Sequence, residues 1–476
     1  MHANLIGGEW VGSSDATRNI NPSDVSDLVG EYGRADAVQV KTAVAAAKDA
    51  FRGWSRSTPQ VRADVLDKAG SEILARRAEL GDLLAREEGK TLAEATGEVT
   101  RAGHIFKYFS GEALRPSGEY VQSVRPDVEV EVTREPVGVI GILTPWNFPI
   151  AIPSWKIAPA LAFGNCVVFK PADLVPGSSW ALADILSRSG LPPGVFNLVM
   201  GRGTVVGEAI VNHPDIPAVS FTGSVATGRG ILEACARRAA KVQLELGGKN
   251  PLVVLADADL DIAVRAALDG AFFSTGQRCT ASSRLIVETG IHDRFVEALT
   301  RAMQQQVVDD ARKSGTTIGP VVDQKQFQQN LDYIEIGKRE GARLVAGGET
   351  LKRDKSGFYM SPALFVDTRA DQRINREEIF GPVAAVTRVS GYEEALASAN
   401  ATPFGLCSGI CTTSLKFARH FQRNAEAGMV MVNLATAGVD YHVPFGGRKD
   451  SSYGPKEQGF AAREFFTQSK TSYIKS

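Results

Sequence analysis

The stretch from residue 137 to residue 245 constrains the fold more than any other part of the chain, because short apolar segments alternate there with helical ones. Strands are expected at residues 137–143, 165–170, 195–200, 218–222 and 241–245, with helices between them at 152–162, 177–189, 204–212 and 224–240. Strands separated by helices of this length need right-handed crossovers and lie parallel in one sheet. The pattern predicts an α/β fold with a doubly wound parallel sheet, which binds its ligands at the carboxyl ends of its strands.

A second alternating set begins after the glycine pair Gly247-Gly248. Its expected strands lie at residues 251–256, 284–288, 343–346, 383–389 and 428–433, and its expected helices at 260–273 and 292–306. We interpret this part as a second α/β domain, separated from the first by the glycine turn.

Two helical segments precede the first sheet, one at residues 36–51 and one that starts at Pro59, has Thr58 as its cap and continues to Leu84. Residues 128–134 then alternate strictly between apolar and polar, as in a half-exposed antiparallel strand. Such a ribbon needs a partner surface, and both a hairpin within one subunit and a contact between subunits remain open. The tail at 465–474 is a candidate for one last strand.

Composition excludes several classes of protein. The 476 residues include 53 basic and 54 acidic ones, which gives no electrostatic reason to expect nucleic acid or an anionic membrane as a partner. Five cysteines without a Cys-x-x-Cys pair argue against a disulfide framework and against a metal site. Residues 137–169 are apolar and long enough to span a bilayer, but four prolines interrupt them. The N-terminus does not resemble a signal peptide, so we expect a cytoplasmic protein.

Cys279 is the candidate nucleophile. A single cysteine is more often a small buried hydrophobe than a reactive group. This one lies between Gly276 and a run of small hydroxyl residues, just before the expected strand 284–288, so its thiol has little bulk around it.

Glycine-bearing turns follow several of the strands in the first set. The turn with Gly203 and Gly207 imitates a dinucleotide fingerprint but has one residue too many before its last glycine. The turn Thr222-Gly223-Ser224 is better placed, because Ser224 would open a helix whose free N–H groups suit a phosphate; simple capping by Ser224 is compatible with that role.

Several blocks together resemble the aldehyde dehydrogenase superfamily. They are Pro-Trp-Asn-Phe-Pro at 145–149, Glu-Leu-Gly-Gly-Lys at 245–249, Gly-Gln-Arg-Cys at 276–279, Glu-Glu-Ile-Phe-Gly-Pro at 377–382 and Pro-Phe-Gly-Gly-Arg-Lys at 444–449. The resemblance implies that Cys279 attacks an aldehyde, that the Asn147 amide and the Cys279 backbone N–H stabilise the oxyanion, and that Glu245 activates water.

The same resemblance implies NAD or NADP as the cofactor. The expected contacts are Trp146, Lys170, Asp173, Gly203, Gly207, Thr222, Gly223, Ser224, Leu246, Glu378 and Phe380. Lys170 and Asp173 follow a parallel strand, where an adenosine ribose can be held. A carboxylate there repels the 2′-phosphate of NADP and favours NAD, although Asp173 is one methylene shorter than the glutamate common in the family.

Within the family, the chain resembles bacterial members that oxidise α-ketoglutarate semialdehyde. An acidic semialdehyde needs a cation for its carboxylate, and Arg101 and Arg278 are the candidates, each of which is also compatible with a structural role. Trp155 stands where many succinic semialdehyde dehydrogenases carry an arginine, which counts against their mode of binding. A broad-specificity enzyme and a succinic or glutaric semialdehyde dehydrogenase stay open as alternatives.

The resemblance also implies a domain division and a homodimer or homotetramer. We expect a dinucleotide-binding domain at residues 1–115 and 137–246, a catalytic domain at 247–450, and oligomerisation segments at 116–136 and 451–476.

Two rival classes of function are a cofactor-free thiol hydrolase, with His442 as its base, and a structural protein without activity. The first leaves the nucleotide-type motifs without a purpose, and the second conflicts with the presence of Cys279, Glu245 and Asn147.

Overall fold

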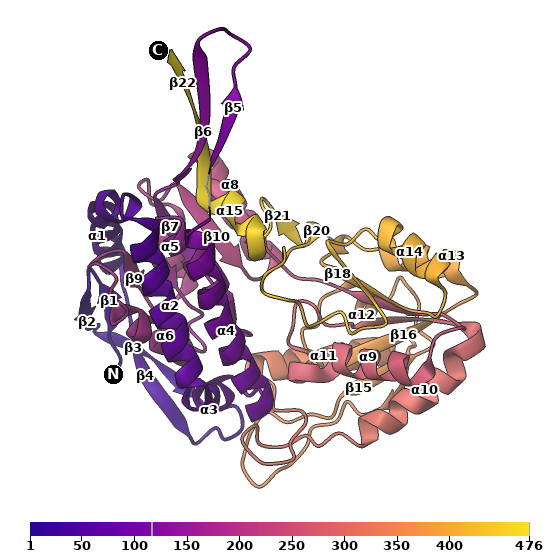
Figure 1. The fold of residues 1–476 in the computed structure, drawn as a ribbon. Helices are drawn as coiled ribbons and strands as arrows, with labels where there is room; N and C mark the ends of the chain where they lie inside the picture. Colours follow the sequence, from indigo (N-terminus) through magenta and orange to yellow (C-terminus); the bar gives the residue numbers. More distant parts are fainter. Residues whose placement is uncertain (116–117, 476) are drawn as a thin grey trace.

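The structure, a computed structural model, describes residues 1–115 and 118–475. Its first sheet has the strand order β2-β1-β9-β8-β7-β10-β11-β21 (Figure 1). The central strands are parallel: β9 (Phe196–Leu198), β8 (Cys166–Lys170), β7 (Val139–Leu143), β10 (Ala218–Thr222) and β11 (Lys241–Glu245). Antiparallel strands flank them: β1 (Asn4–Ile6), β2 (Glu9–Val11) and β21 (Ser452–Tyr453). The order reverses between β7 and β10, which confirms the doubly wound sheet and places its ligand crevice after these two strands.

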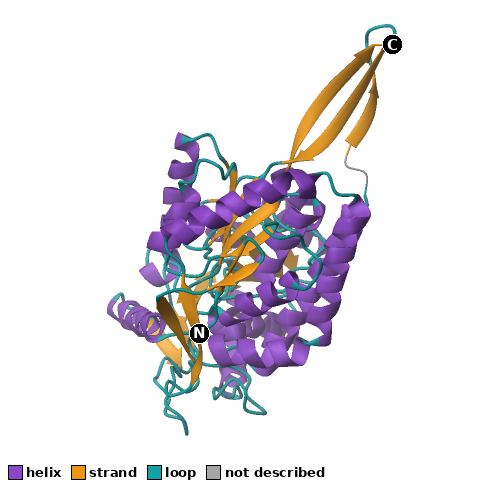
Figure 2. Ribbon diagram, turned by 90° about the vertical axis from the view of Figure 1, so that its left-hand side faces the viewer, coloured by secondary structure: helices purple, strands orange, loops and turns teal. Residues whose placement is uncertain are grey.

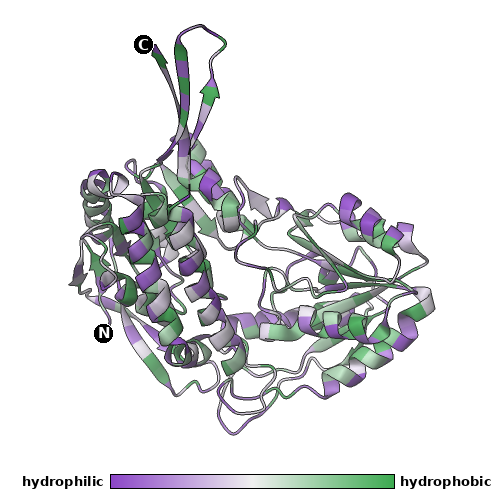
Figure 3. Cartoon of the chain, in the orientation of Figure 1, coloured by the Kyte–Doolittle hydropathy of each residue, from purple (hydrophilic) through white to green (hydrophobic). Residues whose placement is uncertain are grey.

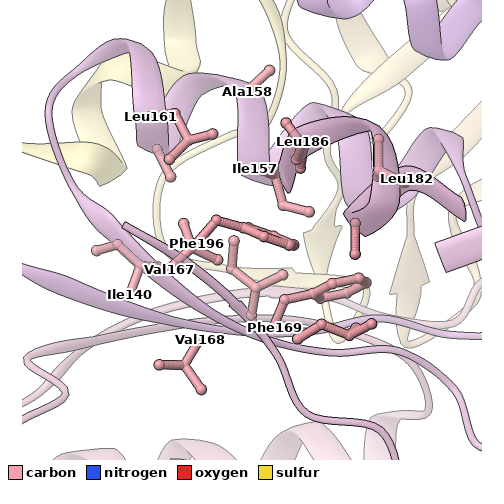
Figure 4. Close-up of a cluster of buried hydrophobic side chains, with 14 of the residues drawn as sticks. Ile140, Ile157, Ala158, Leu161, Val167, Val168, Phe169, Leu182, Leu186 and Phe196 are labelled. Atoms are coloured by element: carbon pink, nitrogen blue, oxygen red, sulfur yellow. The ribbon is translucent and has the colours of Figure 1, made fainter. Parts of the chain in front are cut away.

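Helices cover the first sheet. They are α1 (Ala37–Ser55), α5 (Ala151–Ala162), α6 (Gly177–Ser187), α7 (Glu208–Val211), which extends the π-helical turn Gly203–Gly207, and α8 (Val225–Arg237). Figure 4 shows side chains of α5 and α6 packed over Phe169 and Phe196, while Val168 points to the opposite face. Every residue of α5 is buried, which explains its apolar sequence. Within the described residues, no helix is long and apolar enough to cross a membrane.

The N-terminal helices differ from the prediction at one point. The segment expected from Pro59 to Leu84 is two helices, α2 (Pro59–Ala75) and α3 (Arg77–Glu88), because the chain leaves helical geometry at Arg76. Thr58 caps α2 as predicted, accepting a hydrogen bond from the Val61 N–H at 3.4 Å. A further helix, α4 (Leu92–Ala113), packs against α2, α3 and α5.

The second sheet has the order β14-β15-β16-β13-β12-β18-β19 and is parallel except at β14. Its strands are β14 (Arg343–Ala346), β15 (Ala363–Val366), β16 (Val383–Val389), β13 (Arg284–Glu288), β12 (Pro251–Val254), β18 (Cys407–Cys411) and β19 (Met429–Val432). The helices beside it are α9 (Leu260–Phe272), α10 (Thr289–Gln304), α11 (Gln324–Arg339), α12 (Arg373–Arg376), α13 (Tyr392–Asn400) and α14 (Leu415–Asn424). The predicted strands are present, but the sequence analysis missed β15 and β18.

A three-stranded antiparallel ribbon projects from the body of the molecule (Figures 1 and 2). It consists of β5 (Gly118–Gln122), β6 (Val128–Pro136) and β22 (Thr467–Lys475), which follows the short helix α15 (Ala462–Phe466). Hydrophobic and hydrophilic residues lie side by side along it (Figure 3), as the alternation at 128–134 predicted. Residues 116–117 and 476 of the expected oligomerisation segments lie outside the described residues. The hairpin of β3 (Asp15–Ile20) and β4 (Leu28–Arg34) lies near the N-terminus, and β17 (Phe404–Gly405) pairs with β20 (Arg448–Lys449).

Candidate active site

Cys279 lies in a loop between the turn Phe273–Gly276 and β13, beside a cavity of about 750 Å³. The loop begins with left-handed backbone at Ser274 (φ 51°) and Thr275 (φ 56°). Gly276 follows at φ 66°, and a Cβ there would lie 2.3 Å from the carbonyl oxygen of Gly381. The Ser274 N–H donates to Glu94 at 2.8 Å, which offsets part of the cost of this conformation. Backbone shape therefore fixes where the thiol meets the cavity.

Polar groups surround the Cys279 backbone. The Asn147 side chain, in the loop after β7, donates to the carbonyl oxygen of Gln277 at 3.0 Å. The Asn250 amide donates to the carbonyl oxygen of Cys279 at 2.7 Å. Burial, assisted by the charges of Glu378 and Glu245, raises the pKa of the Cys279 thiol to about 12. Asn147, Cys279 and Glu245, the three residues predicted to carry the chemistry, thus lie in one region. The raised pKa means that the Cys279 sulfur is protonated at neutral pH.

Glu245 ends β11 with its carboxylate buried. Oε2 accepts a hydrogen bond from the Ser452 hydroxyl at 2.6 Å, and Oε1 has no partner among the described residues. Burial and the charge of Glu457 raise its pKa well above the usual value. A Cβ on Gly446, at φ 146°, would lie 2.4 Å from Oε1. The glycine of the C-terminal block therefore leaves room for this carboxyl group.

The crevice after β7 and β10 contains two unsatisfied hydroxyls. Thr144 and Thr222 are buried, and their Oγ1 atoms have no hydrogen-bond partner among the described residues. Ser224 caps α8 by accepting from the Thr227 N–H at 3.3 Å, as the sequence predicted. Gly223 has no room for a side chain, because a Cβ would lie 2.4 Å from the Phe221 ring. Buried polar atoms are normally paired, so these hydroxyls fit a polar ligand at the switch point of the sheet.

The remaining residues of the first crevice are Gly203, Gly207, Lys170 and Asp173. Gly203 and Gly207 begin and end the π-helical turn after β9. Lys170 is buried and donates to the carbonyl oxygen of Pro171, and burial lowers its pKa to about 8. Asp173 already has partners, since it accepts from Thr17 and forms an ion pair with Arg34 at 3.1 Å. The negative charge of Asp173 is therefore offset by a cation that the sequence analysis did not consider.

Glu378, Phe380, Trp146 and Leu246 lie near the turn that joins the two sheets. Glu378 accepts from the Gly248 N–H at 3.0 Å, and burial raises its pKa to about 7. The Phe380 ring meets the Trp146 ring edge to face at 5.3 Å. Leu246 packs over Gly228 of α8, where a Cβ would lie 2.5 Å from Leu246 Cδ2. These four expected cofactor contacts, which come from both sheets, are thus brought together near one turn.

The predicted substrate residues Arg101, Trp155 and Arg278 all line the cavity that contains Cys279. Arg101 donates to Gln458 at 3.2 Å and lies 5.6 Å from the Trp155 ring. Arg278 donates to the carbonyl oxygens of Asp269 and Gly270 and lies over the Phe273 ring. Each guanidinium has a buried Nε without a partner among the described residues.

His442 is exposed and is not one of the described residues that line the cavity, so the arrangement gives no support to a Cys279–His442 hydrolase.

Sequence reasoning missed several polar residues in and around the cavity. Glu457 is buried and accepts from the indole N–H of Trp155 at 2.6 Å and from Lys156. Lys90, Glu94 and Glu98 line the cavity from α4 and the turn before it. The sequence did contain one signal for these residues: Glu94 and Glu98 lie four residues apart, among the apolar positions of α4. Glutamates are seldom buried on a helix face unless they have a partner.

Comparison with known proteins agrees with this geometry. The profile of the Aldehyde dehydrogenase family matches residues 10–472. The α-ketoglutaric semialdehyde dehydrogenase of Bacillus subtilis is 44% identical, covering 100% of this chain and 98% of the relative. The α-ketoglutarate semialdehyde dehydrogenase of Haloferax volcanii is 41% identical, with 99% and 98% covered.

Solved structures agree as well. Betaine aldehyde dehydrogenase of Staphylococcus aureus, crystallised with NAD⁺, superposes with a TM-score of 0.97 at 32% identity, covering 100% of this chain and 94% of that one. An NAD-dependent aldehyde dehydrogenase of Sinorhizobium meliloti gives 0.97 at 35% identity, with 100% and 94% covered. The chain described here belongs to the aldehyde dehydrogenase family.

Proposed function

We propose that this enzyme oxidises α-ketoglutarate semialdehyde to 2-oxoglutarate with NAD or NADP. The observation that carries the substrate is a cavity lined by Cys279, by the buried Arg278 and by the half-buried Arg101. A cavity that buries guanidinium groups with unused N–H donors favours an aldehyde that carries a carboxylate at its other end. The names of the Bacillus and Haloferax relatives support the same substrate.

The residues present fit a nicotinamide dinucleotide. Thr144 and Thr222 offer unpaired hydroxyls at the switch point, and Ser224 opens α8 beside them, where the helix N-terminus suits a pyrophosphate. Glu378 and Phe380 would hold the nicotinamide ribose, with Trp146 against Phe380. When bound, the cofactor would supply the acceptor for a hydride. The Staphylococcus aureus betaine aldehyde dehydrogenase was crystallised with NAD⁺, which favours NAD over NADP as the cofactor.

The roles of the chain's own residues follow from their chemistry. The Cys279 thiol first loses its proton to solvent, and the thiolate attacks the aldehyde carbon. The Asn147 amide and the Cys279 backbone N–H stabilise the oxyanion of the thiohemiacetal. Loss of hydride leaves a thioester on Cys279. Glu245, once deprotonated, removes a proton from the water that attacks the thioester carbon. The carboxylic acid is released, and the proton on Glu245 passes to the departing sulfur, which regenerates the thiol.

Of the two arginines, Arg101 is the better candidate for the substrate carboxylate. Arg278 gives Nη2 to the carbonyl oxygens of Asp269 and Gly270, so much of its hydrogen-bonding capacity holds the chain together. Arg101 has one side-chain partner, Gln458, which can be displaced without breaking backbone structure. Two alternatives predict the same chemistry: an enzyme of broad specificity, and one that oxidises succinic or glutaric semialdehyde. They differ in which aldehyde has the highest kcat/KM.

The ribbon supports a proposed homodimer or homotetramer. Tyr120, Val121, Tyr473 and Ile474 are exposed on its strands, and large exposed apolar side chains on a projecting sheet favour a contact with another subunit. We place residues 1–115 and 137–246 in the cofactor domain, 247–450 in the catalytic domain, and the remaining segments at the subunit contact. Light scattering that shows a monomer at working concentration would contradict this assembly.

Five free cysteines agree with the reducing, cytoplasmic setting that we propose for the enzyme.

Initial rates of NAD(P)H formation test the function. α-Ketoglutarate semialdehyde, succinic semialdehyde and propanal are each assayed with NAD and with NADP, with Cys279→Ala as the control. We expect the first substrate to lead in kcat/KM by about tenfold or more, which corresponds to about 1.4 kcal/mol of transition-state discrimination. Equal rates with all three aldehydes contradict the substrate, and no product with any of them contradicts the activity.

A further inference from the structure

The turn between α3 and α4 contributes a group of buried charges behind the active-site loops. Gly89 ends α3 in left-handed geometry (φ 93°), and Thr91 begins α4 with a capping box to Glu94. This tight turn places Lys90 inside the protein, where its side chain is 2% exposed. A buried lysine is costly unless it is paired, so its partners indicate why it is there.

Lys90 has partners on both sides. Its Nζ donates to Glu98 Oε2 at 2.8 Å and to the backbone carbonyl oxygen of Asn147, and it lies 3.8 Å from the centre of the Phe148 ring. Burial alone would lower the pKa of Lys90, but the charges of Glu88 and Glu98 outweigh it and hold that pKa above its usual value. The ammonium group therefore stays charged and remains a donor to the Asn147 loop.

Glu98 holds the other end of the same loop. Its Oε1 accepts from the backbone N–H groups of Ile150 and Ala151, both at 3.1 Å, while its Oε2 accepts from Lys90. The ion pair thus spans the chain from Asn147 to Ala151, and it holds the Pro-Trp-Asn-Phe-Pro block at its central asparagine and just after its last proline.

Glu94, one helical turn earlier, does the same for the nucleophile loop. Its Oε1 accepts from the Ser274 N–H at 2.8 Å, and its Oε2 accepts from the Thr91 N–H at 2.9 Å. Two successive turns of α4 therefore hold the two loops that the hydrogen bond from Asn147 to Gln277 joins.

We propose that Lys90 and Glu98 are positioning residues for aldehyde oxidation: their ion pair holds the backbone of Asn147 so that its side-chain amide points to where the oxyanion forms. This role rests on the proposed function. Both residues line the cavity, but the positioning role assigned to them is exerted through the backbone of Asn147. Displacement of a reacting group by about 1 Å costs on the order of a hundredfold in rate, so the ion pair has a large effect on kcat.

The test compares Lys90→Met with Lys107→Met, a lysine of α4 that is paired with Asp67 on the surface. We expect Lys90→Met to lower kcat by about 100-fold with little change in the KM for NAD, and Lys107→Met to match the wild type. Iodoacetamide should alkylate Cys279 in Lys90→Met at the wild-type rate, because Glu94 still holds the nucleophile loop. An unchanged kcat, or a parallel fall in kcat and alkylation rate, overturns the proposal.

Glu98→Gln provides a milder variant if Lys90→Met does not fold, since a glutamine oxygen still accepts from Ile150 and Ala151. It should lower kcat in the same selective way but by less. A crystal structure of either variant gives a second test that does not depend on activity. In it, the Asn147 amide should lie farther from the Gln277 carbonyl oxygen than in the wild type. An Asn147 side chain in its wild-type place overturns the positioning role, whereas a wild-type enzyme that oxidises no aldehyde contradicts the proposed function instead.

Discussion

The side-chain amide nitrogen of Asn147 lies 3.0 Å from the backbone carbonyl oxygen of Gln277, two residues before Cys279. This hydrogen bond joins the loop after β7 to the loop that carries the nucleophile. An amide already fixed near the thiol needs no reorganisation when negative charge develops on a substrate oxygen.

Asn147→Ala should therefore lower kcat by about 10²–10³-fold, the usual effect of removing one oxyanion donor, which corresponds to about 2.7–4 kcal/mol. The KM for the cofactor should change little. Steady-state kinetics with saturating NAD measures both quantities. A KM effect without a kcat effect would mean that Asn147 binds ligand rather than stabilises the transition state.

Glu245→Gln should separate the two halves of the reaction. In the proposed mechanism, hydride transfer needs Cys279 and Asn147, whereas hydrolysis of the thioester needs a base. We expect a burst of NADH equivalent to the concentration of active sites, followed by turnover about 10²–10⁴-fold slower than in the wild type. Stopped-flow absorbance measures the burst. Ser452→Ala, which removes the hydrogen bond to Glu245, is the matched control and should keep most of its turnover. A variant with slow turnover and no burst contradicts the assignment of Glu245 to the second half.

The parallel sheet and the positions of Cys279, Glu245 and Asn147 were accessible from sequence, because the apolar strands are local patterns and the blocks that contain these three residues are contiguous. The strand β18 (Cys407–Cys411) was not, since a short segment with serine and glycine shows no β-branched pattern although its neighbours bury it completely. The ion pairs Lys90–Glu98 and Arg34–Asp173 depend on how helices and loops pack, and the second joins residues 139 positions apart.

Arg101→Met should affect aldehydes according to their charge. A charge-assisted hydrogen bond contributes about 1.5–3 kcal/mol, so kcat/KM for α-ketoglutarate semialdehyde should fall by about 10–100-fold while that for propanal stays the same. Arg278→Met loses bonds to the carbonyl oxygens of Asp269 and Gly270, so it should lower the melting temperature and reduce the rates with both aldehydes. An equal loss for both aldehydes in Arg101→Met would assign it a structural role.

The pH dependence of Cys279 alkylation follows from its pKa. Burial and the charges of Glu378 and Glu245 raise that pKa to about 12, so the thiolate is a minor species throughout the neutral range. Below the pKa the thiolate fraction grows about tenfold per pH unit, and alkylation of the cofactor-free enzyme by iodoacetamide should follow it. The rate should rise from pH 7 to pH 10 without a plateau. Cys279→Ala corrects for the other cysteines, and a plateau below pH 9 contradicts the raised pKa.

Arg34 should decide how well the enzyme tolerates NADP. Asp173 alone would repel a 2′-phosphate, but Arg34 Nη2 lies 3.1 Å from its carboxylate and offsets the negative charge. Arg34→Met leaves that carboxylate without its cation, so the KM for NADP should rise by about five- to tenfold more than the KM for NAD, which corresponds to about 1–1.4 kcal/mol.

Asp173→Ala tests the same ion pair from its other side. It frees the guanidinium and should improve the KM for NADP while it weakens the hold on the ribose of NAD. Initial rates with both cofactors in both variants measure the shift. Since the pair is partly exposed, added salt should reduce the difference between the cofactors. Equal effects on NAD and NADP in both variants would place the ion pair outside the reach of the 2′-phosphate.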